Sequence, residues 1–482
     1  MKRGHFVWTF LGPRVLLVLL FARIPAANAQ TPGTFTPAGN MATPRYRHTA
    51  TLLPNGKVLI AGGSETATAE IYDPSSGSFT ATGDMTTPRS MHTATLLADG
   101  RVLLAGGYSS SKTLAGAEIY DPSTGAFTPT GDMVTAQFAH TATLLNDGTV
   151  LIAGGEQGPP WPTSVRAELY DPSTGKFVST GNYAGPNSLY PAAAGPIWPT
   201  ATRLPDGKVL FAGDNPAELY DPVTRTFSLA GRMVSSSYRY GMYWHAATLL
   251  PSGRVIVTGG TDDFFDFSDA EAFEPSTGRF AASGKMLTAR ELHTSTLLTD
   301  GTVLIAGGGD GGWGASRLPS AELYDPETAA FSSTSYMATN RSGHTSTLLK
   351  TGEVLVTGGV QYWPFRTLET AELYTPRVVV PAPVVTALGF DPTTVAAGGS
   401  YSVNLSGANL TSETFFDVRF STPEGNAYAV VLNWQRGATG SHSVSPDTTP
   451  GSWTIRGVRA HRIETDHTGD FDPVSSTITV SP

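Results

Sequence analysis

The residues of this sequence best suited to binding chemistry are aromatic, and they lie in the segments where otherwise similar repeats differ most. Trp and Tyr present flat apolar faces with polar edges, which suit stacking on a sugar or a peptide. Asp262, Asp263 and Asp310 stand in the same segments. The candidate binding residues are Trp161, Tyr183, Tyr190, Trp198, Tyr238, Tyr240, Tyr243, Trp244, Phe265, Trp313 and Trp363.

For any single ring a structural interpretation stays open, because long Pro-rich loops often pack their own aromatic side chains together. For the rings as a group we favour a ligand surface. Residues 181–198, the longest of these segments, leave two alternatives open. Either they cover the short unit that follows them, or that unit has simply diverged.

Six histidines and seven glutamates have side chains that could bind a metal or move protons, but they recur once per repeat. These residues are His48, His92, His140, His245, His293 and His344, with Glu70, Glu118, Glu168, Glu218, Glu271, Glu322 and Glu372. Most of the histidines follow an arginine by three residues, as His92 follows Arg89. Features at the repeat period usually belong to the packing of the repeat, and buried charges need partners. We therefore assign them to the scaffold.

Motifs for metals and cofactors are weak. The segment "TDDFFDFSD" could hold calcium through Asp262, Asp263 and Asp266, but it lacks the twelve-residue spacing of a calcium loop. The stretch "GGGDGGWG" from Gly307 lacks the Lys and Ser/Thr of a phosphate-binding loop. Neither Gly-x-Ser-x-Gly nor His-Glu-x-x-His occurs. The sequence predicts no cofactor, with calcium kept as a less favoured alternative.

A unit that occurs seven times must position these side chains. "HTATLLPNGKVLIAGG" from His48 returns in related form at intervals of 44 to 59 residues, which is the range of propeller blades. Each copy is expected to form two apolar strands joined by a two-residue turn such as Asn55-Gly56, with positive φ at both positions. A second hairpin follows, as in "AEIYDPSSGSFT" from Ala69. Each unit therefore contributes four antiparallel strands.

The last unit lacks a fourth strand, since "AELYTPRVVV" from Ala371 ends after its third. The missing strand is "GTFTPAGNM", residues 33–41, which matches "GSFTATGDM" at residues 77–85. The sequence thus predicts an all-β fold, a seven-bladed β-propeller over residues 30–377 that its N-terminal strand closes. The Asn-Gly and "DPSTG" turns fall on one face, here called the bottom. The aromatic segments fall on the opposite, top face, where loops on a rigid scaffold commonly bind ligands.

The remaining segments and the composition define the setting. Residues 1–29 have a basic start, a short apolar run and an Ala-x-Ala site before Gln30, which are typical of a secretory signal peptide. The apolar run is too short to span a bilayer. The chain has no cysteine, and its net charge of −9 is evenly spread. These features favour an exported protein, extracellular, periplasmic or associated with the cell surface, and disfavour binding to nucleic acid.

The repeats carry a family resemblance. The double glycines from Gly62-Gly63 onward, the Tyr of "YDP" and an aromatic residue on the fourth strand make residues 33–376 resemble kelch repeats, although Phe replaces the usual Trp. Residues 378–383 form a Pro-bounded linker, and alternating residues over 384–482 favour an immunoglobulin-like β-sandwich. The segment from Pro450 through "SWTIRGVRA" resembles the C-terminal domain that follows the propeller in galactose oxidase.

That second resemblance implies an oxidase with copper and a tyrosyl radical crosslinked to cysteine. This chain departs at the decisive residue, because without cysteine the thioether cannot form. Tyr240, Tyr243 and His245 leave a cysteine-free copper site as a less favoured alternative. We therefore predict a secreted binding protein whose top-face aromatic loops recognise a glycan or an extracellular protein. The alternative is a galactose-oxidase-like or other carbohydrate-active enzyme that uses the same face.

Overall fold

The computed structural model describes most of the chain. The described residues are 33–64, 66–157, 166–183, 198–213, 216–234, 242–262, 265–310, 316–361, 365–376, 384–391, 393–396, 399–408, 414–421, 428–436, 439–443, 451–461 and 476–481. The chain divides into two compact units, one over Thr31–Arg377 and one containing Val378–Pro482. The predicted signal peptide and the linker 378–383 lie outside the described residues. Within these residues the structure is built from β-strands, and no helix is long and apolar enough to cross a membrane.

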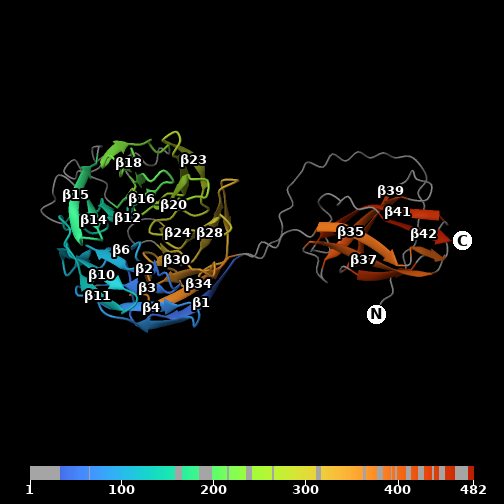
Figure 1. The fold of residues 1–482 in the computed structure, drawn as a ribbon, viewed down its shortest axis with the longest axis horizontal. Coiled ribbons are helices and arrows are strands. Elements are labelled where there is room, and N and C mark those ends of the chain that lie inside the picture. Colours follow the sequence, from blue (N-terminus) through green and yellow to red (C-terminus); the bar gives the residue numbers. More distant parts are fainter. Residues whose placement is uncertain are drawn as a thin grey trace. The chain divides into compact units, whose positions relative to one another are not determined.

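The first unit is a seven-bladed propeller, as the repeats predict (Figure 1). Its described residues form seven four-stranded antiparallel sheets. The innermost strands are β2 (Thr49–Leu52), β6 (Thr93–Leu96), β12 (Thr141–Leu144), β16 (Thr200–Arg203), β20 (Ala246–Leu249), β24 (Thr294–Leu297) and β30 (Thr345–Leu348). The second strands are β3 (Val58–Ala61), β7 (Val102–Ala105), β13 (Val150–Ala153), β17 (Val209–Ala212), β21 (Val255–Thr258), β25 (Val303–Ala306) and β31 (Val354–Thr357).

The two outer strands of each blade complete the sheets. The third strands are β4 (Ala69–Asp73), β10 (Ala117–Asp121), β14 (Arg166–Asp171), β18 (Glu218–Asp221), β22 (Asp269–Glu274), β28 (Ala321–Asp325) and β34 (Thr370–Thr375). The outermost strands are β5 (Ser78–Ala81), β11 (Ala126–Pro129), β15 (Lys176–Asn182), β19 (Thr226–Leu229), β23 (Arg279–Lys285), β29 (Ala330–Ser333) and β1 (Thr34–Asn40).

The last blade has the strand order β1-β34-β31-β30, so the N-terminal strand closes the ring. Thr34 of β1 pairs with Thr375 of β34, and the Phe35 and Tyr374 rings lie 4.9 Å apart. Closure by residues 33–41 is therefore confirmed. The second strands are buried throughout because both faces of each blade pack on a neighbouring blade, which explains their continuous apolar sequences.

The turns at the bottom correct one expectation. Gly56 has a φ of +86°, but Asn55 does not have a positive φ. The Leu53 N–H donates to Lys57 O at 2.8 Å and the Gly56 N–H donates to Leu53 O at 2.9 Å, which makes a three-residue loop with a left-handed glycine at its end. The prediction of a two-residue turn was wrong. A three-residue loop with glycine in third place also suits a twisted hairpin, so the Asn-Gly pair alone does not separate the two.

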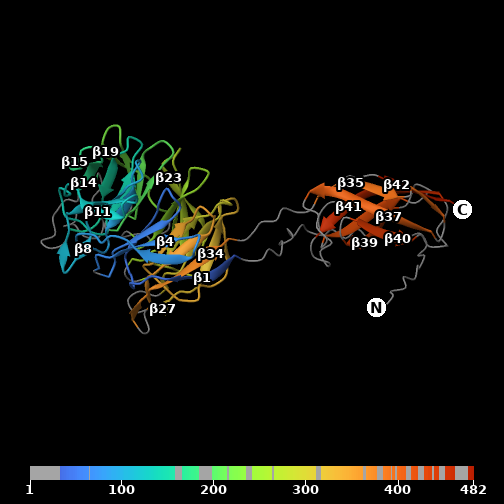
Figure 2. The same cartoon turned by 60° about the horizontal axis from the view of Figure 1, so that its bottom comes forward.

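On the top face, short hairpins extend three of the blades beyond the second strand. They pair β8 (Tyr108–Ser109) with β9 (Lys112–Thr113), β26 (Gly309–Asp310) with β27 (Ser316–Arg317), and β32 (Val360–Gln361) with β33 (Arg366–Thr367). Figure 2 shows β8 and β27 extending beyond the body of the propeller. Gly62, directly after the second strand of the first blade, has a φ of +64°, and a Cβ there would stand 2.5 Å from Arg89 O. The double glycines thus let the next blade approach.

The second unit contains two sheets. One has the order β35-β37-β40 and the other β36-β42-β41-β38-β39. Their strands are β35 (Val384–Asp391), β36 (Thr394–Ala396), β37 (Ser400–Ala408), β38 (Phe415–Ser421), β39 (Tyr428–Arg436), β40 (Thr439–Ser443), β41 (Gly451–His461) and β42 (Ser476–Ser481). All pairs are antiparallel except β36 with β42. The immunoglobulin-like class of this unit stays a prediction.

Candidate functional site

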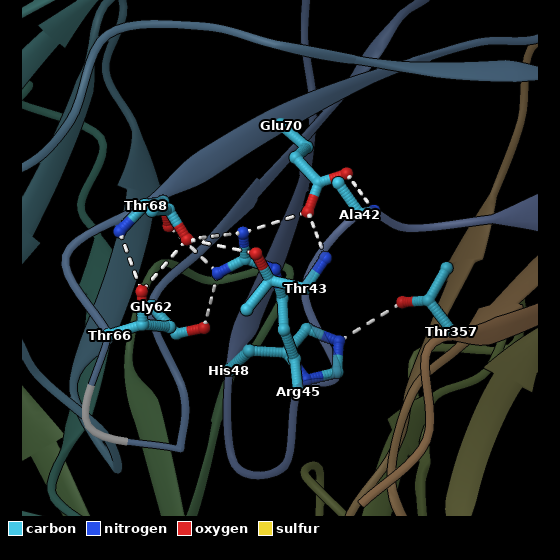
Figure 3. Close-up of polar contacts among 9 residues, drawn as sticks. All are labelled: Ala42, Thr43, Arg45, His48, Gly62, Thr66, Thr68, Glu70 and Thr357. Carbon is cyan, nitrogen blue, oxygen red and sulfur yellow. Dashed lines mark hydrogen bonds and ion pairs between the residues drawn. The ribbon is translucent and has the colours of Figure 1, made fainter.

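The recurring Arg and Glu side chains form buried networks within blades. In the first blade Arg45 Nη2 lies 2.9 Å from Glu70 Oε1, and Arg45 Nη1 donates to Gly62 O and Thr68 O at 2.8 Å each (Figure 3). The Ala42 N–H donates to the other Glu70 oxygen at 2.8 Å. Three further pairs, each at 2.7 Å, are Arg89–Glu118, Arg290–Glu322 and Arg341–Glu372. Each carboxylate holds the segment that leads into the inner strand of its own blade, which is a structural role.

The repeat histidines join each blade to the one before it. His92 Nε2 and the Thr49 hydroxyl are hydrogen-bonded at 3.1 Å, and His140 Nε2 pairs with the Thr93 hydroxyl at 3.0 Å. Burial, with a smaller contribution from the Arg45 charge, lowers the pKa of His48 to about 3. Burial likewise lowers the pKa of His140 to about 4. The histidines are therefore neutral scaffold groups near neutral pH, in agreement with their repeat period.

In every blade the residue directly before the repeat histidine has a left-handed backbone conformation. In the fourth blade Pro199 takes the place of this histidine. The seven φ angles lie between 51° and 59°, at Arg47, Met91, Ala139, Trp198, Trp244, Leu292 and Gly343. The Met91 N–H donates to Arg47 O at 3.0 Å, and the Arg47 N–H donates to Gly343 O at 3.2 Å. Further bonds of this kind join Ala139 to Met91, Leu292 to Trp244, and Gly343 to Leu292. The seven positions thus encircle the propeller axis at its top end, and we call them the axial ring.

Four side chains meet at this ring. Arg47 Cζ lies 5.3 Å from the centre of the Trp198 ring, although the two residues come from the first and fourth blades. The Trp198 and Trp244 rings meet edge to face at 5.8 Å. Trp198 Nε1–H donates to Glu156 Oε1 at 2.5 Å. Arg47, Glu156, Trp198 and Trp244 are called the axial cluster below.

Two further aromatic residues support the cluster from one side. The Phe138 ring lies 6.4 Å from Trp198 in an edge-to-face arrangement, and Tyr108 lies 5.3 Å from Phe138. The backbones of Phe138 and Glu156 exchange two hydrogen bonds of 2.9 Å. This bridge fixes Glu156 beside the indole that it binds. A line of rings therefore runs from the second blade to the fifth across the top of the axis.

The two charged groups of the cluster, Glu156 and Arg47, have different surroundings. Burial raises the pKa of the Glu156 carboxyl, while the Trp198 hydrogen bond and the nearby Arg47 charge act to lower it. Arg47 Nη1 lies 3.3 Å from the Met91 sulfur, which is a weak acceptor. No carboxylate among the described residues lies within ion-pair distance of Arg47. The arrangement combines a cation, an indole face and one engaged carboxyl group, which can hold a polar ligand through stacking and hydrogen bonds.

The structure brings together two of the predicted site residues, Trp198 and Trp244. Tyr243 is buried, and its backbone exchanges two hydrogen bonds of 2.9 Å with Thr261. Phe265 is 70 % exposed on a top loop. Tyr183 packs 4.4 Å from Phe227 in the core between two blades, which is a structural contact.

The other predicted site residues lie outside the described residues. They are Trp161, Tyr190, Tyr238, Tyr240, Trp313 and Trp363. Sequence reasoning missed Arg47, Phe138 and Glu156. A signal for Arg47 was present, because the position before each repeat histidine varies from Arg to Gly within a motif that is otherwise nearly constant.

Metal binding finds little support among the side chains that the structure describes. No group of three or more His, Asp or Glu residues there could hold an ion. Asp262 of the proposed calcium segment accepts the Phe265 N–H at 2.8 Å, and Asp263 lies outside the described residues. His245 Nε2 is hydrogen-bonded to the Thr200 hydroxyl at 2.9 Å. Tyr240, another residue of the suggested copper site, lies outside the described residues.

Comparisons with known proteins agree with this fold. The Kelch motif model matches residues 88–134, which span the second blade. No curated protein matches the chain by sequence. Among solved structures, a fungal alcohol oxidase of the AA5 family, in complex with copper, is similar with a TM-score of 0.60 and 17 % identity. The match covers 94 % of this chain and 100 % of that one. The chain therefore contains a seven-bladed β-propeller with a Kelch motif, and its fold is similar to that of this AA5 alcohol oxidase.

Proposed function

We propose that the chain is an exported binding protein whose axial cluster holds a glycan. The observation that carries this proposal is the meeting of Arg47, Trp198 and Glu156 from three different blades at one point of the top face. An indole with a cation and a carboxyl group at its edge suits a sugar, which has apolar C–H faces and hydroxyl groups around them. The secretory signal peptide that the sequence predicts over residues 1–29 supports export.

A glycan is favoured over a protein partner because the convergent residues are few and centred on the axis. Large exposed apolar side chains of the described residues are instead dispersed over several blades. They are Val134, Val178, Val223, Leu229, Val234, Phe265, Leu287, Tyr336 and Phe365. Stable protein interfaces require a contiguous area on the order of 800 Å² on each partner.

The test is a glycan array probed with the wild-type protein and with Trp198→Ala and Trp244→Ala. Both substitutions are compatible with the backbone, because Ala139 occupies the same left-handed position in the axial ring. Wild-type binding that each variant weakens about tenfold or more supports the proposal, since a stacking contact contributes on the order of 1 to 3 kcal/mol. Tyr336→Ala, which removes an aromatic side chain 66 % exposed outside the cluster, serves as the matched control. Absence of wild-type binding to every glycan contradicts the proposal.

Catalysis is the second candidate, favoured by the similarity to a copper-containing AA5 oxidase. Its test is the metal content of the mature protein after exposure to copper and dialysis. Retained stoichiometric copper that is lost in Tyr243→Phe or His245→Asn supports an oxidase. Retention of no copper leaves glycan binding as the function proposed.

A further inference from the structure

Arg47, which is half-buried, differs from the buried arginines of the propeller in lacking a carboxylate. Arg45, Arg89, Arg290 and Arg341 each lie 2.7 to 2.9 Å from a glutamate oxygen. Arg47 has the Met91 sulfur at 3.3 Å, and its Nε is buried without a hydrogen-bond partner among the described residues. A guanidinium group has five N–H donors, and among the described residues only the Met91 sulfur engages one of them.

The backbone and two rings hold Arg47 in place. Its N–H and C=O both take part in the hydrogen bonds of the axial ring. Its guanidinium group lies over the rings of Tyr46, at 4.9 Å, and Trp198, at 5.3 Å. The Tyr46 ring in turn occupies the space over Gly343, where a Cβ would stand 2.3 Å from Tyr46 Cε2. The cation is thus preorganised before any ligand arrives, which limits the entropy lost on binding.

A second donor of the axial cluster, and one that is the cluster's neighbour in sequence, have no acceptor within the described part of the chain. Trp244 Nε1 is buried without a partner, and its ring lies against Trp198. Gln157 Nε2 is also buried without a partner, one residue after Glu156. The unsatisfied groups of Arg47 and Trp244, both in the axial cluster, are donors, so the complementary ligand is rich in acceptors. A carboxylate fits this requirement, because it offers two oxygens and pairs with a guanidinium group in a bidentate manner.

We propose that the axial cluster recognises an acidic glycan, in which a uronic acid carboxylate binds Arg47 and the sugar ring stacks beside the Trp198 indole. This inference rests on the proposed glycan binding and specifies the class of glycan. The net charge of the chain is −9, so non-specific attraction of anions does not explain such binding. Recognition has to come from the local pairing with Arg47.

Substitution of Glu156 provides a second test, in which binding of an acidic glycan is expected to become tighter and not weaker. Its carboxylate lies close enough to act on the Arg47 charge, and it would repel an acidic ligand. Glu156→Gln removes this repulsion while it keeps an oxygen that can accept the Trp198 N–H. The substitution is expected to tighten binding of an acidic glycan about threefold to tenfold, as the loss of a nearby like charge predicts. It is not expected to tighten binding of a neutral one.

The experiment is calorimetric titration of the full mature protein with oligogalacturonate, oligoglucuronate and the methyl esters of both. The wild-type protein is expected to bind at least one acid about tenfold or more tightly than its ester. Arg47→Met should remove that preference, and the variant should fold because Met91 occupies an equivalent ring position. Arg47→Lys should restore part of the preference, since the charge returns without the bidentate geometry.

Four outcomes separate the two proposals. Equal binding of acids and esters that Arg47→Met leaves unchanged overturns the acidic specificity but keeps glycan binding. Array binding confined to neutral glycans has the same meaning. Failure of every glycan to bind contradicts both proposals, and an acidic peptide that binds through Arg47 when no uronate does would overturn the glycan assignment.

Discussion

At the scale of single residues, hydroxyl pairs join most neighbouring blades. The Tyr hydroxyl on a third strand bonds a Thr or Ser hydroxyl of the preceding blade's fourth strand. The pairs are Thr82–Tyr120, Thr130–Tyr170, Thr180–Tyr220, Ser283–Tyr324 and Thr334–Tyr374, at 2.6 to 3.1 Å. The fifth blade has Phe273, and Ala230 stands at the Thr position facing it. In the first blade, by contrast, Tyr72 faces Ala38, and its hydroxyl has no partner among the described residues.

This mismatch predicts that Tyr72→Phe is close to neutral for stability, whereas Tyr170→Phe is destabilising. The first substitution removes a buried hydroxyl group that has no partner. The second breaks the 2.9 Å bond to Thr130 and should lower the free energy of unfolding by about 1 kcal/mol. Urea denaturation of both variants beside the wild type measures the difference. Equal losses in the two variants would contradict the interpretation.

The Arg–Glu networks are also unevenly distributed. The first, second, sixth and seventh blades have an arginine three residues before the histidine, but Gln137 takes this place in the third blade. Gln137 is fully buried, and both atoms of its amide lack partners among the described residues. Its contribution to stability should therefore differ from that of the arginines.

We predict that Arg290→Met lowers the free energy of unfolding by about 3 to 5 kcal/mol, since it leaves the buried Glu322 charge unpaired. Gln137→Met should be neutral or slightly stabilising, because it removes unsatisfied polar atoms at similar volume. The double variant Arg290→Met/Glu322→Gln should regain part of the loss. Thermal and chemical denaturation test all three, and a mild effect of Arg290→Met would show that the pair contributes little.

At the scale of elements, β1 decides whether the ring is closed. It comes from the start of the chain yet pairs with β34 over Thr34–Asn40, with a register shift between Pro37 and Asn40. The Thr334 hydroxyl also donates to Gly33 O at 3.3 Å, which ties the strand to the sixth blade. Pro is tolerated in β1 because this strand is the outer edge of its sheet.

Phe35→Ala should therefore open the last blade locally, in addition to a loss of about 2 kcal/mol from the removed ring contact with Tyr374. Amide hydrogen exchange is expected to accelerate in β34. Phe79→Ala is the matched control, since Phe79 lies 4.9 Å from Tyr72 at the equivalent position of the first blade, where the strands are joined by a short turn. If exchange in β34 is similar in both variants, β1 is held to its blade as firmly as a fourth strand that a short turn joins to the third.

At the scale of the whole molecule, six neutral histidines make the propeller sensitive to acid. Burial is the main cause that lowers the pKa of His48 and His293 to about 3, and the pKa of His140 and His245 to about 4. Since the unfolded chain binds protons near pH 6.5, this contribution is fully present above that pH. It is lost as the pH falls toward the folded values.

We therefore predict that the urea midpoint falls steeply from pH 7 to pH 5, with each histidine contributing up to about 1.4 kcal/mol per pH unit. Glu156 and Glu168 act in the opposite direction, because burial raises the pKa of both carboxyl groups, but they are outnumbered. His92→Gln should make the urea midpoint less dependent on pH, because it removes the contribution of one of the six histidines. A midpoint that does not change between pH 7 and pH 5 would contradict the assignment of neutral histidines.

The sequence by itself determined the blades, their number and their closure by residues 33–41. These features depend on local patterns: apolar strands, glycine turns and a repeat whose missing strand has a recognisable match. It also indicated that the repeat histidines and glutamates belong to the scaffold and not to a binding site, because residues with a packing role recur once per repeat.

Only the tertiary structure decided which side chains meet on the axis. Arg47 and Trp198 come from the first and fourth blades, and no local pattern links them. Ring closure nevertheless places both within one circle of left-handed residues. The hydroxyl mismatch of Ala38 with Tyr72 is likewise visible only once the first and last strands are neighbours. Contacts across the axis depend on the geometry of all seven blades together, which is why the sequence named Trp198 and Trp244 but not the arginine and the carboxylate beside them.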